Sequence, residues 1–168
     1  MPKGLKETSS IIMIGASAVE TAPGTFTSVR VDLQLNPLDN EVFIVYSADL
    51  DGRTPDLIAA TRTDTKLSVS TTARTSVGSI ADSNVIAQLA TVVEEAGGAA
   101  VLNSKMAGET PPAALEYIGI IATNDFYVNV QGTNNVNATS GNVRLYGVRA
   151  KADASIYAAL VQSELLSA

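Results

Sequence analysis

The stretch DLDGRTPD is the sharpest candidate for chemistry in this sequence. It sets three carboxylates, those of Asp49, Asp51 and Asp56, around a glycine-bearing loop, and clustered oxygen ligands suit Ca²⁺. The spacing lacks the third ligand position and the terminal bidentate Glu of an EF-hand loop. Two interpretations stay open: a Ca²⁺ site, or a solvated turn in which Asp side chains cap their own backbone.

Acid–base and nucleophilic catalysis find little support in the residue types. The chain has no His and no Cys, which removes imidazole bases, thiolate nucleophiles and thiolate metal sites together. Glu94 and Glu95 are adjacent, so on a helix they would point in different directions instead of converging on a substrate. No Ser lies in a Ser-x-x-Lys or Gly-x-Ser-x-Gly setting. We therefore expect a protein that is not an enzyme and that holds no cofactor apart from the Ca²⁺ candidate.

The charge balance argues against strong nucleic-acid binding. The net charge is −6, with 11 basic residues spread among 17 acidic ones, whereas phosphate binding depends on clustered Lys and Arg. No apolar run approaches the length of a transmembrane span, so we expect no transmembrane segment.

Alternating apolar and polar residues predict strands along most of the chain. The predicted strands are 10–14, 26–35, 41–49, 65–73, 117–123, 125–131 and 142–150. The segment from Glu41 is apolar on both faces, which predicts cover on both sides. We expect 26–35 and 41–49 to form a hairpin through the turn NPLDN, and 124–151 to form a second hairpin with a polar tip.

Two segments have helical spacing of apolar residues. The first is 83–98, with Ser83 as N-cap and Gly97 as the stop, and the second is 153–166, with Asp153 as N-cap. The fold prediction is mainly β: an antiparallel, jelly-roll-like β-sandwich of about 7–8 strands with one or two short helices. No linker is long enough to separate two domains, so one domain spans residues 1–168, with an N-terminal segment that is a candidate for flexibility.

The predicted second hairpin carries the candidate interaction surface. One of its faces is apolar, and the other presents Tyr, Asn, Gln and Arg, of which Tyr and Arg are enriched at the anchors of protein interfaces. The candidate interface residues are Tyr127, Asn129, Gln131, Arg144, Tyr146 and Arg149. The alternative is an ordinary outer face of a sheet.

The stretches ATNDFYVNVQGTNN and NVRLYGVRAKADASIYAAL resemble the closing strands of small coat proteins of icosahedral viruses. The resemblance lies in strand count, loops rich in Asn, Gly and Thr, low charge and the absence of Cys and His. It implies a single β-sandwich or jelly-roll subunit of a virion, a capsid or cement protein, which assembles with itself and with other virion proteins. The basic arm that is common in coat proteins holding RNA is missing. The alternatives are a carbohydrate- or ligand-binding β-sandwich module and a surface-layer or filament subunit.

Overall fold

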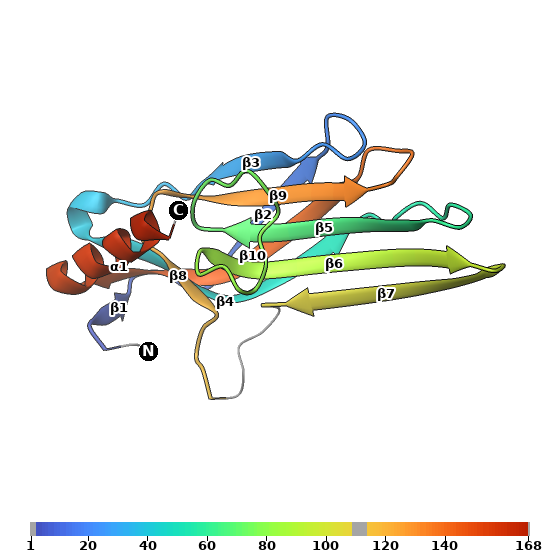
Figure 1. Cartoon of the computed structure of the whole chain (residues 1–168). Coiled ribbons are helices and arrows are strands. Elements are labelled where there is room, and N and C mark those ends of the chain that lie inside the picture. The colour runs from blue at the N-terminus through green and yellow to red at the C-terminus, as the bar shows by residue number, and fades with distance from the viewer. Residues whose placement is uncertain (1–2, 109–113, 168) are drawn as a thin grey trace.

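Two antiparallel sheets pack face to face in the computed structural model, which describes residues 3–108 and 114–167 (Figure 1). Sheet A contains β1 (Leu5–Glu7), β2 (Ile12–Val19), β4 (Glu41–Gly52), β8 (Gly119–Ile121) and β10 (Ser140–Ala152). Sheet B contains β3 (Thr27–Asp32), β5 (Arg62–Ser70), β6 (Val85–Ala96), β7 (Ala99–Ala107) and β9 (Asp125–Thr133). One helix, α1 (Ala154–Leu166), follows β10. The predicted antiparallel sandwich is confirmed, with ten strands in the described part of the chain.

The strands pair from the ends of the chain inward. β2 pairs with β10, β3 with β9, β4 with β8, and β5 with β6, all antiparallel. This is one long ribbon rolled on itself, because β4 also lies beside β10 in sheet A and β5 beside β9 in sheet B. Such a rolled double sheet is the jelly roll. β1 extends the β2 edge of sheet A, and β7 extends sheet B beyond β6.

Both predicted hairpins are wrong. β3 lies in sheet B and β4 in sheet A, and β9 and β10 are likewise divided between the two sheets. The predicted turn exists: Asn36 accepts a hydrogen bond from the backbone N–H of Leu38 at 3.1 Å and begins the 3₁₀ helix η1 (Pro37–Asp39). The turn residues indicate only that the chain reverses direction. In the jelly roll, the chain also crosses from one sheet to the other at these turns.

The predicted helix over 83–98 is also wrong, since Val85–Ala96 is strand β6. Gly97 and Gly98 follow with φ values of 62° and 82°, as a two-residue type I′ turn requires, and they connect β6 to β7. The β-branched run Thr91–Val93 favours the strand. The second helix is confirmed as α1, although the side chain of its N-cap, Asp153, makes no capping hydrogen bond.

The apolar strand β4 is covered on both faces, as predicted. Phe43 and Val45 lie in the core between the sheets. Val42 and Ile44 lie on the other side of sheet A, in a second cluster to which α1 contributes. The side chains of α1 in that cluster are those of Ile156, Tyr157, Leu160 and Val161. Sheet A therefore has apolar clusters on both of its faces. α1 lies at the end of the molecule opposite the tip of the β6–β7 hairpin (Figure 1).

A buried carboxylate attaches α1 to sheet A. Glu164 accepts hydrogen bonds from the backbone N–H groups of Ala122, at 2.7 Å, and Thr123, at 2.9 Å. Burial raises the pKa of Glu164 above its ordinary value, and these hydrogen bonds oppose the rise only in part.

The raised pKa of Glu164 gives stability a definite pH dependence. The folded chain holds this proton more tightly than the unfolded chain, so the contribution to the free energy of unfolding is complete below the unfolded pKa and is lost as pH rises through the folded pKa. We expect the stability of the native protein relative to Glu164→Gln to fall as pH rises from about 4 to 7. Urea denaturation at a series of pH values measures this difference in the free energy of unfolding. Ser163→Ala, on the same helix, is the control because it changes no ionisable group. If the stability difference from the native protein changed equally with pH for both variants, Glu164 would not be the source of the pH dependence.

Candidate assembly surfaces

Sheet A presents an exposed polar patch on its outer face, beside the region that α1 covers. We call it the sheet A patch, and it consists of Asp49, Asp51, Asn142, Arg144 and Tyr146. The register places Arg144 beside Asp49, and Asn142 beside Asp51. The hydroxyl of Tyr146 donates to the Asp49 carboxylate at 2.8 Å. A hydrogen bond with Tyr146 raises the pKa of Arg144 above its ordinary value.

The neighbouring strand β2 leaves this patch open. Gly15 and Ser17 stand beside Arg144 and Asn142 in the register and are exposed. Gly15, which has no side chain, and the small residues Ala16 and Ser17 line a shallow groove along β2, β4 and β10. The patch joins both signs of charge with a tyrosine, and Tyr and Arg are among the residue types enriched at protein interfaces.

Of the three aspartates of the candidate Ca²⁺ site, Asp49 and Asp51 lie in the sheet A patch and Asp56 lies in the loop after β4. Within residues 3–108 and 114–167, no three acidic side chains are arranged to hold a metal ion. Asp56 accepts hydrogen bonds from the backbone N–H groups of Val136, at 3.0 Å, and Asn137, at 2.9 Å. These bonds, with Asn137 foremost, lower the pKa of Asp56. Its carboxylate therefore connects two loops.

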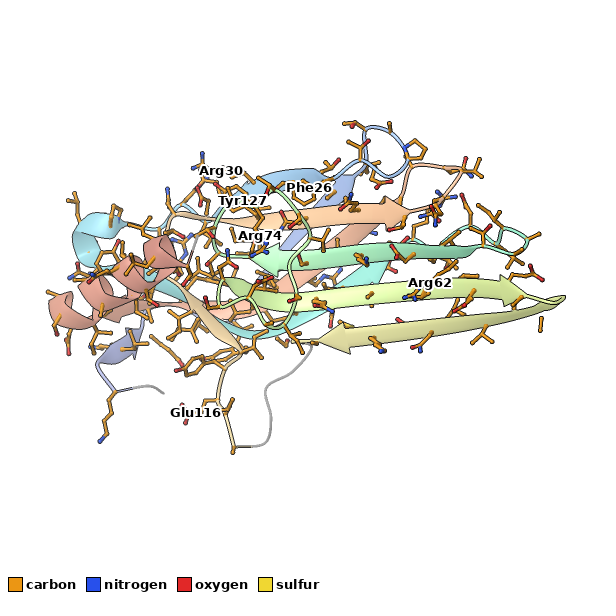
Figure 2. The ribbon with its side chains drawn as sticks, viewed as in Figure 1. Phe26, Arg30, Arg62, Arg74, Glu116 and Tyr127 are labelled. Carbon is orange, nitrogen blue, oxygen red and sulfur yellow. The ribbon has the colours of Figure 1, made fainter. Side chains whose placement is uncertain are left out.

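The other predicted interface residues do not join the sheet A patch. Tyr127, Asn129 and Gln131 lie on β9 in sheet B, where Tyr127 lies beside Arg30 (Figure 2). Asn129 is 0% exposed. Its side chain accepts from the Ser28 hydroxyl at 2.8 Å and donates to that of Ser70 at 2.9 Å.

The loop between β5 and β6, residues 71–84, passes over the outer face of sheet B (Figure 1). The N–H of Gly78 in this loop donates to the Ser68 hydroxyl at 3.0 Å, and Asn129 also contacts that hydroxyl. Gln131 is half-buried, and its amide donates to the carbonyl of Gly24 at 3.1 Å. Of the three predicted interface residues on β9, Tyr127 and Gln131 retain accessible surface and Asn129 does not.

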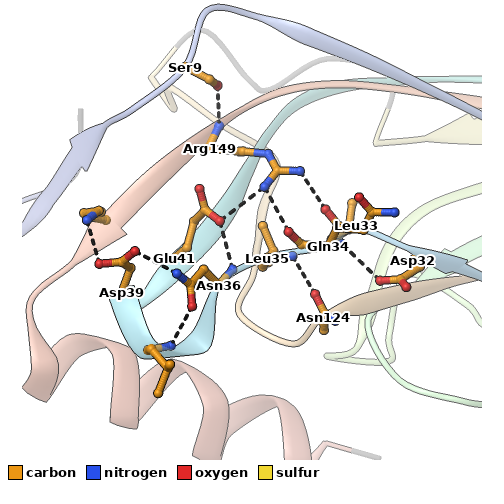
Figure 3. Close-up of polar contacts among 12 residues, drawn as sticks. Ser9, Asp32, Leu33, Gln34, Leu35, Asn36, Asp39, Glu41, Asn124 and Arg149 are labelled. Carbon is orange, nitrogen blue, oxygen red and sulfur yellow. Dashed lines mark hydrogen bonds and ion pairs between the residues drawn. The ribbon is translucent and has the colours of Figure 1, made fainter.

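Arg149 holds the connection between β3 and β4 in place (Figure 3). Its guanidinium donates to the carbonyls of Leu33, at 2.8 Å, and Gln34, at 3.1 Å, and to the Glu41 carboxylate at 3.2 Å. This side chain thus makes three hydrogen bonds within the chain. Of the six predicted interface residues, three lie on β9 in sheet B and three on β10 in sheet A.

The second surface, the free edge of β7, escaped the sequence-based prediction. β7 ends sheet B, and no strand in the described part of the chain pairs with its far side. Seven of its nine residues are exposed, among them Val101 at 65% and Leu102 at 57%. The signal that could have found it is the Gly-Gly pair between two runs of strand-forming residues, which predicts a hairpin.

No protein-family model and no curated protein matches this chain. Among solved structures, it is similar to the VP1 of Merkel cell polyomavirus in an unassembled pentamer, with 5% identity, a TM-score of 0.37 and coverage of 87% of this chain and 96% of that one. A desmodium yellow mottle tymovirus protein has 9% identity, a TM-score of 0.31 and coverage of 88% and 93%. The VP1 of trichodysplasia spinulosa-associated polyomavirus has 7% identity, a TM-score of 0.30 and coverage of 90% and 96%.

These structural neighbours are virus proteins, the class that the sequence resembles. No helix in the described residues is long and apolar enough to cross a membrane.

Proposed function

We propose that this chain is a non-enzymatic structural subunit that assembles with copies of itself into a closed shell, and that the shell is a virus capsid. The observation that carries the proposal is the free edge of β7. An edge strand of nine residues, with exposed Val101 and Leu102 and a single charged residue, Lys105, is a template for pairing with another strand. Proteins that stay monomeric usually shorten, charge or cover such an edge.

Composition and fold support the same proposal. Only 17% of the residues are charged against 46% hydrophobic, which suits a subunit that buries much of its surface against copies. The jelly roll occurs in viral capsids and also in lectins and cupins, so topology alone does not select the function. The absence of His and Trp weakens the metal-centred and sugar-stacking alternatives.

A shell needs more than one kind of contact. A two-fold contact joins two subunits and then closes, whereas a lattice requires a second, different interface. The sheet A patch lies on the other sheet from β7 and is the candidate for that second contact. The proposed location is therefore the virion, and the proposed partners are copies of this chain together with other virion proteins.

Light scattering on a sizing column, with negative-stain microscopy, tests this proposal. We expect closed particles of a mass far above 17.4 kDa. We also expect the double variant Arg144→Ala, Tyr146→Ala to reduce particle yield while circular dichroism shows an unchanged fold. A monomer over a wide concentration range would overturn the proposal in favour of a ligand-binding module, and open sheets or filaments in place of closed particles would favour a surface-layer or filament subunit.

A further inference from the structure

We propose that two copies of this chain pair along the free edges of their β7 strands, antiparallel, about a two-fold axis at Asn103. This inference rests on the proposed function, because it names a second copy as the partner of the exposed edge. The pairing joins the two B sheets into one continuous sheet, since β7 is the last strand of each. We call the contact the β7 seam.

The turn of the hairpin determines which backbone groups of β7 face away from β6. Ala96 stands opposite Ala99 across the Gly97–Gly98 turn, and the closing pair of a two-residue hairpin exchanges hydrogen bonds. Bonded and non-bonded pairs then alternate along an antiparallel ladder. The odd-numbered residues of β7 therefore bond to β6. The residues whose N–H and C=O groups face the free edge are Ala100, Leu102, Ser104 and Met106.

Symmetry and overlap then determine the register of the seam. A two-fold axis perpendicular to the sheet keeps the outer faces of both copies on one side, so odd residues stand opposite odd ones and even opposite even ones. Overlap of all nine residues puts Asn103 opposite Asn103 of the second copy. Leu102 then stands opposite Ser104 of the second copy. Each even residue can exchange two hydrogen bonds across the seam, about eight in total.

This register avoids opposing like charges. Lys105 stands opposite Val101 of the second copy, and Val101 lies beside Glu94 on β6. Strands are about 4.8 Å apart, so the Cα atoms of Lys105 and the second copy's Glu94 lie about 10 Å apart, a distance that two long side chains span. An axis at Lys105 would instead oppose two ammonium groups, which is unfavourable.

Apolar side chains also become covered in this register. Leu102 is 57% exposed in the single chain and lies on the face of β7 that is turned toward the core, beside Val93. Across the seam, its diagonal neighbours are Leu102 and Met106 of the second copy, within reach of long side chains. The seam thus removes apolar surface from water in addition to pairing the backbone edge.

A single cysteine tests the register directly, because the chain contains no cysteine and an introduced thiol has only its own copy as a partner. Asn103 forms a non-bonded pair on the axis, with Cα atoms about 4.5 Å apart, within the range that a disulfide bridges. We expect Asn103→Cys to give a disulfide-linked dimer on mild oxidation, seen on a non-reducing gel. Val101→Cys is the matched control, since the two copies of Val101 lie about 14 Å apart and should remain unlinked.

A second pair of variants tests the backbone pairing. Ser104→Pro in the Asn103→Cys background removes an N–H that faces the free edge but none that bonds to β6, so we expect the fold to remain and the linkage to be lost. Ser104→Ala is its control, because both variants remove the 3.2 Å contact of the Ser104 hydroxyl with Thr91, and we expect it to link like the parent.

The outcomes separate this inference from the proposed function. If Asn103→Cys forms particles but no disulfide-linked dimer, or if Val101→Cys links equally well, the β7 seam is wrong and the proposed shell is not affected. If Asn103→Cys links and Val101→Cys does not, but the native chain forms no particle larger than a dimer, the β7 seam is supported and the proposed shell is wrong.

Discussion

Replacing Gly147 with Ala lowers the free energy of unfolding by about 3 kcal/mol. Gly147 lies on β10 where the register with β4 shifts, between the pairs Tyr146–Ser47 and Gly147–Val45. A Cβ atom at this position would come within 2.2 Å of the carbonyl oxygen of Ile44 and 2.7 Å of the Phe43 ring. The backbone of β4 would have to move, because the carbonyl of Ile44 belongs to a paired strand and cannot turn away as a side chain can.

Gly15→Ala on the neighbouring strand β2 is the matched control. Its Cβ would touch only the Val143 carbonyl, at 3.9 Å, which is ordinary contact. We expect a change within about 0.5 kcal/mol for this variant. Urea denaturation of both proteins measures the difference, and equal stability would show that β4 does not approach β10 as closely as the structure has it.

The sequence carries more information about faces than about partners. Alternation in 125–131 correctly predicts that Phe126, Val128 and Val130 point into the core, and the apolar run from Glu41 correctly predicts cover on both faces of β4. Alternation is a property of each strand alone. Strand pairing depends on the whole jelly roll. Strands that follow each other in the sequence, such as β3 and β4, are therefore predicted to pair but lie in different sheets.

The segment 83–98 shows a second limit. Val85, Ile86, Leu89, Val92 and Val93 fit a helical stripe, yet the segment is β6. On the strand, Leu89 and Val93 are buried together with Ala87, and Val92 is half-buried, so only two residues of the helical stripe also belong to the buried face of the strand. The Gly-Gly turn decides in favour of the strand, because two positive φ values suit a hairpin and a helix stop needs only one.

The candidate interface could be predicted only in part for a similar reason. Alternation identified Arg144 and Tyr146 as outward-facing, and both belong to the sheet A patch. It equally identified Asn129, which the 71–84 loop covers. Arg149, the other predicted residue of β10, makes its hydrogen bonds to the β3–β4 connection. A strand pattern tells which side chains leave the core, and only the path of distant loops tells which of them reach solvent.

A buried carboxylate supports the polar loop between β9 and β10. Glu20 is 4% exposed, and its two oxygens accept from the backbone N–H groups of Gly132, at 2.6 Å, and Thr139, at 2.8 Å. The backbone N–H of Glu20 also donates to the Thr139 carbonyl at 2.9 Å. This carboxylate therefore holds both ends of the loop.

Glu20→Ala is expected to lower the free energy of unfolding by about 2–6 kcal/mol, because it leaves two buried N–H groups without an acceptor, each costing about 1–3 kcal/mol. Glu20→Gln keeps the shape but presents an NH₂ donor to one of the two N–H groups, so its loss should be smaller. Urea denaturation gives the free energies, and amide hydrogen exchange at Gly132 and Thr139 shows whether the loss is local. The exposed Glu94→Ala is the control, with a change within about 0.5 kcal/mol. If Glu20→Ala lost no more than this control, the ends of the loop would be held by the strands alone.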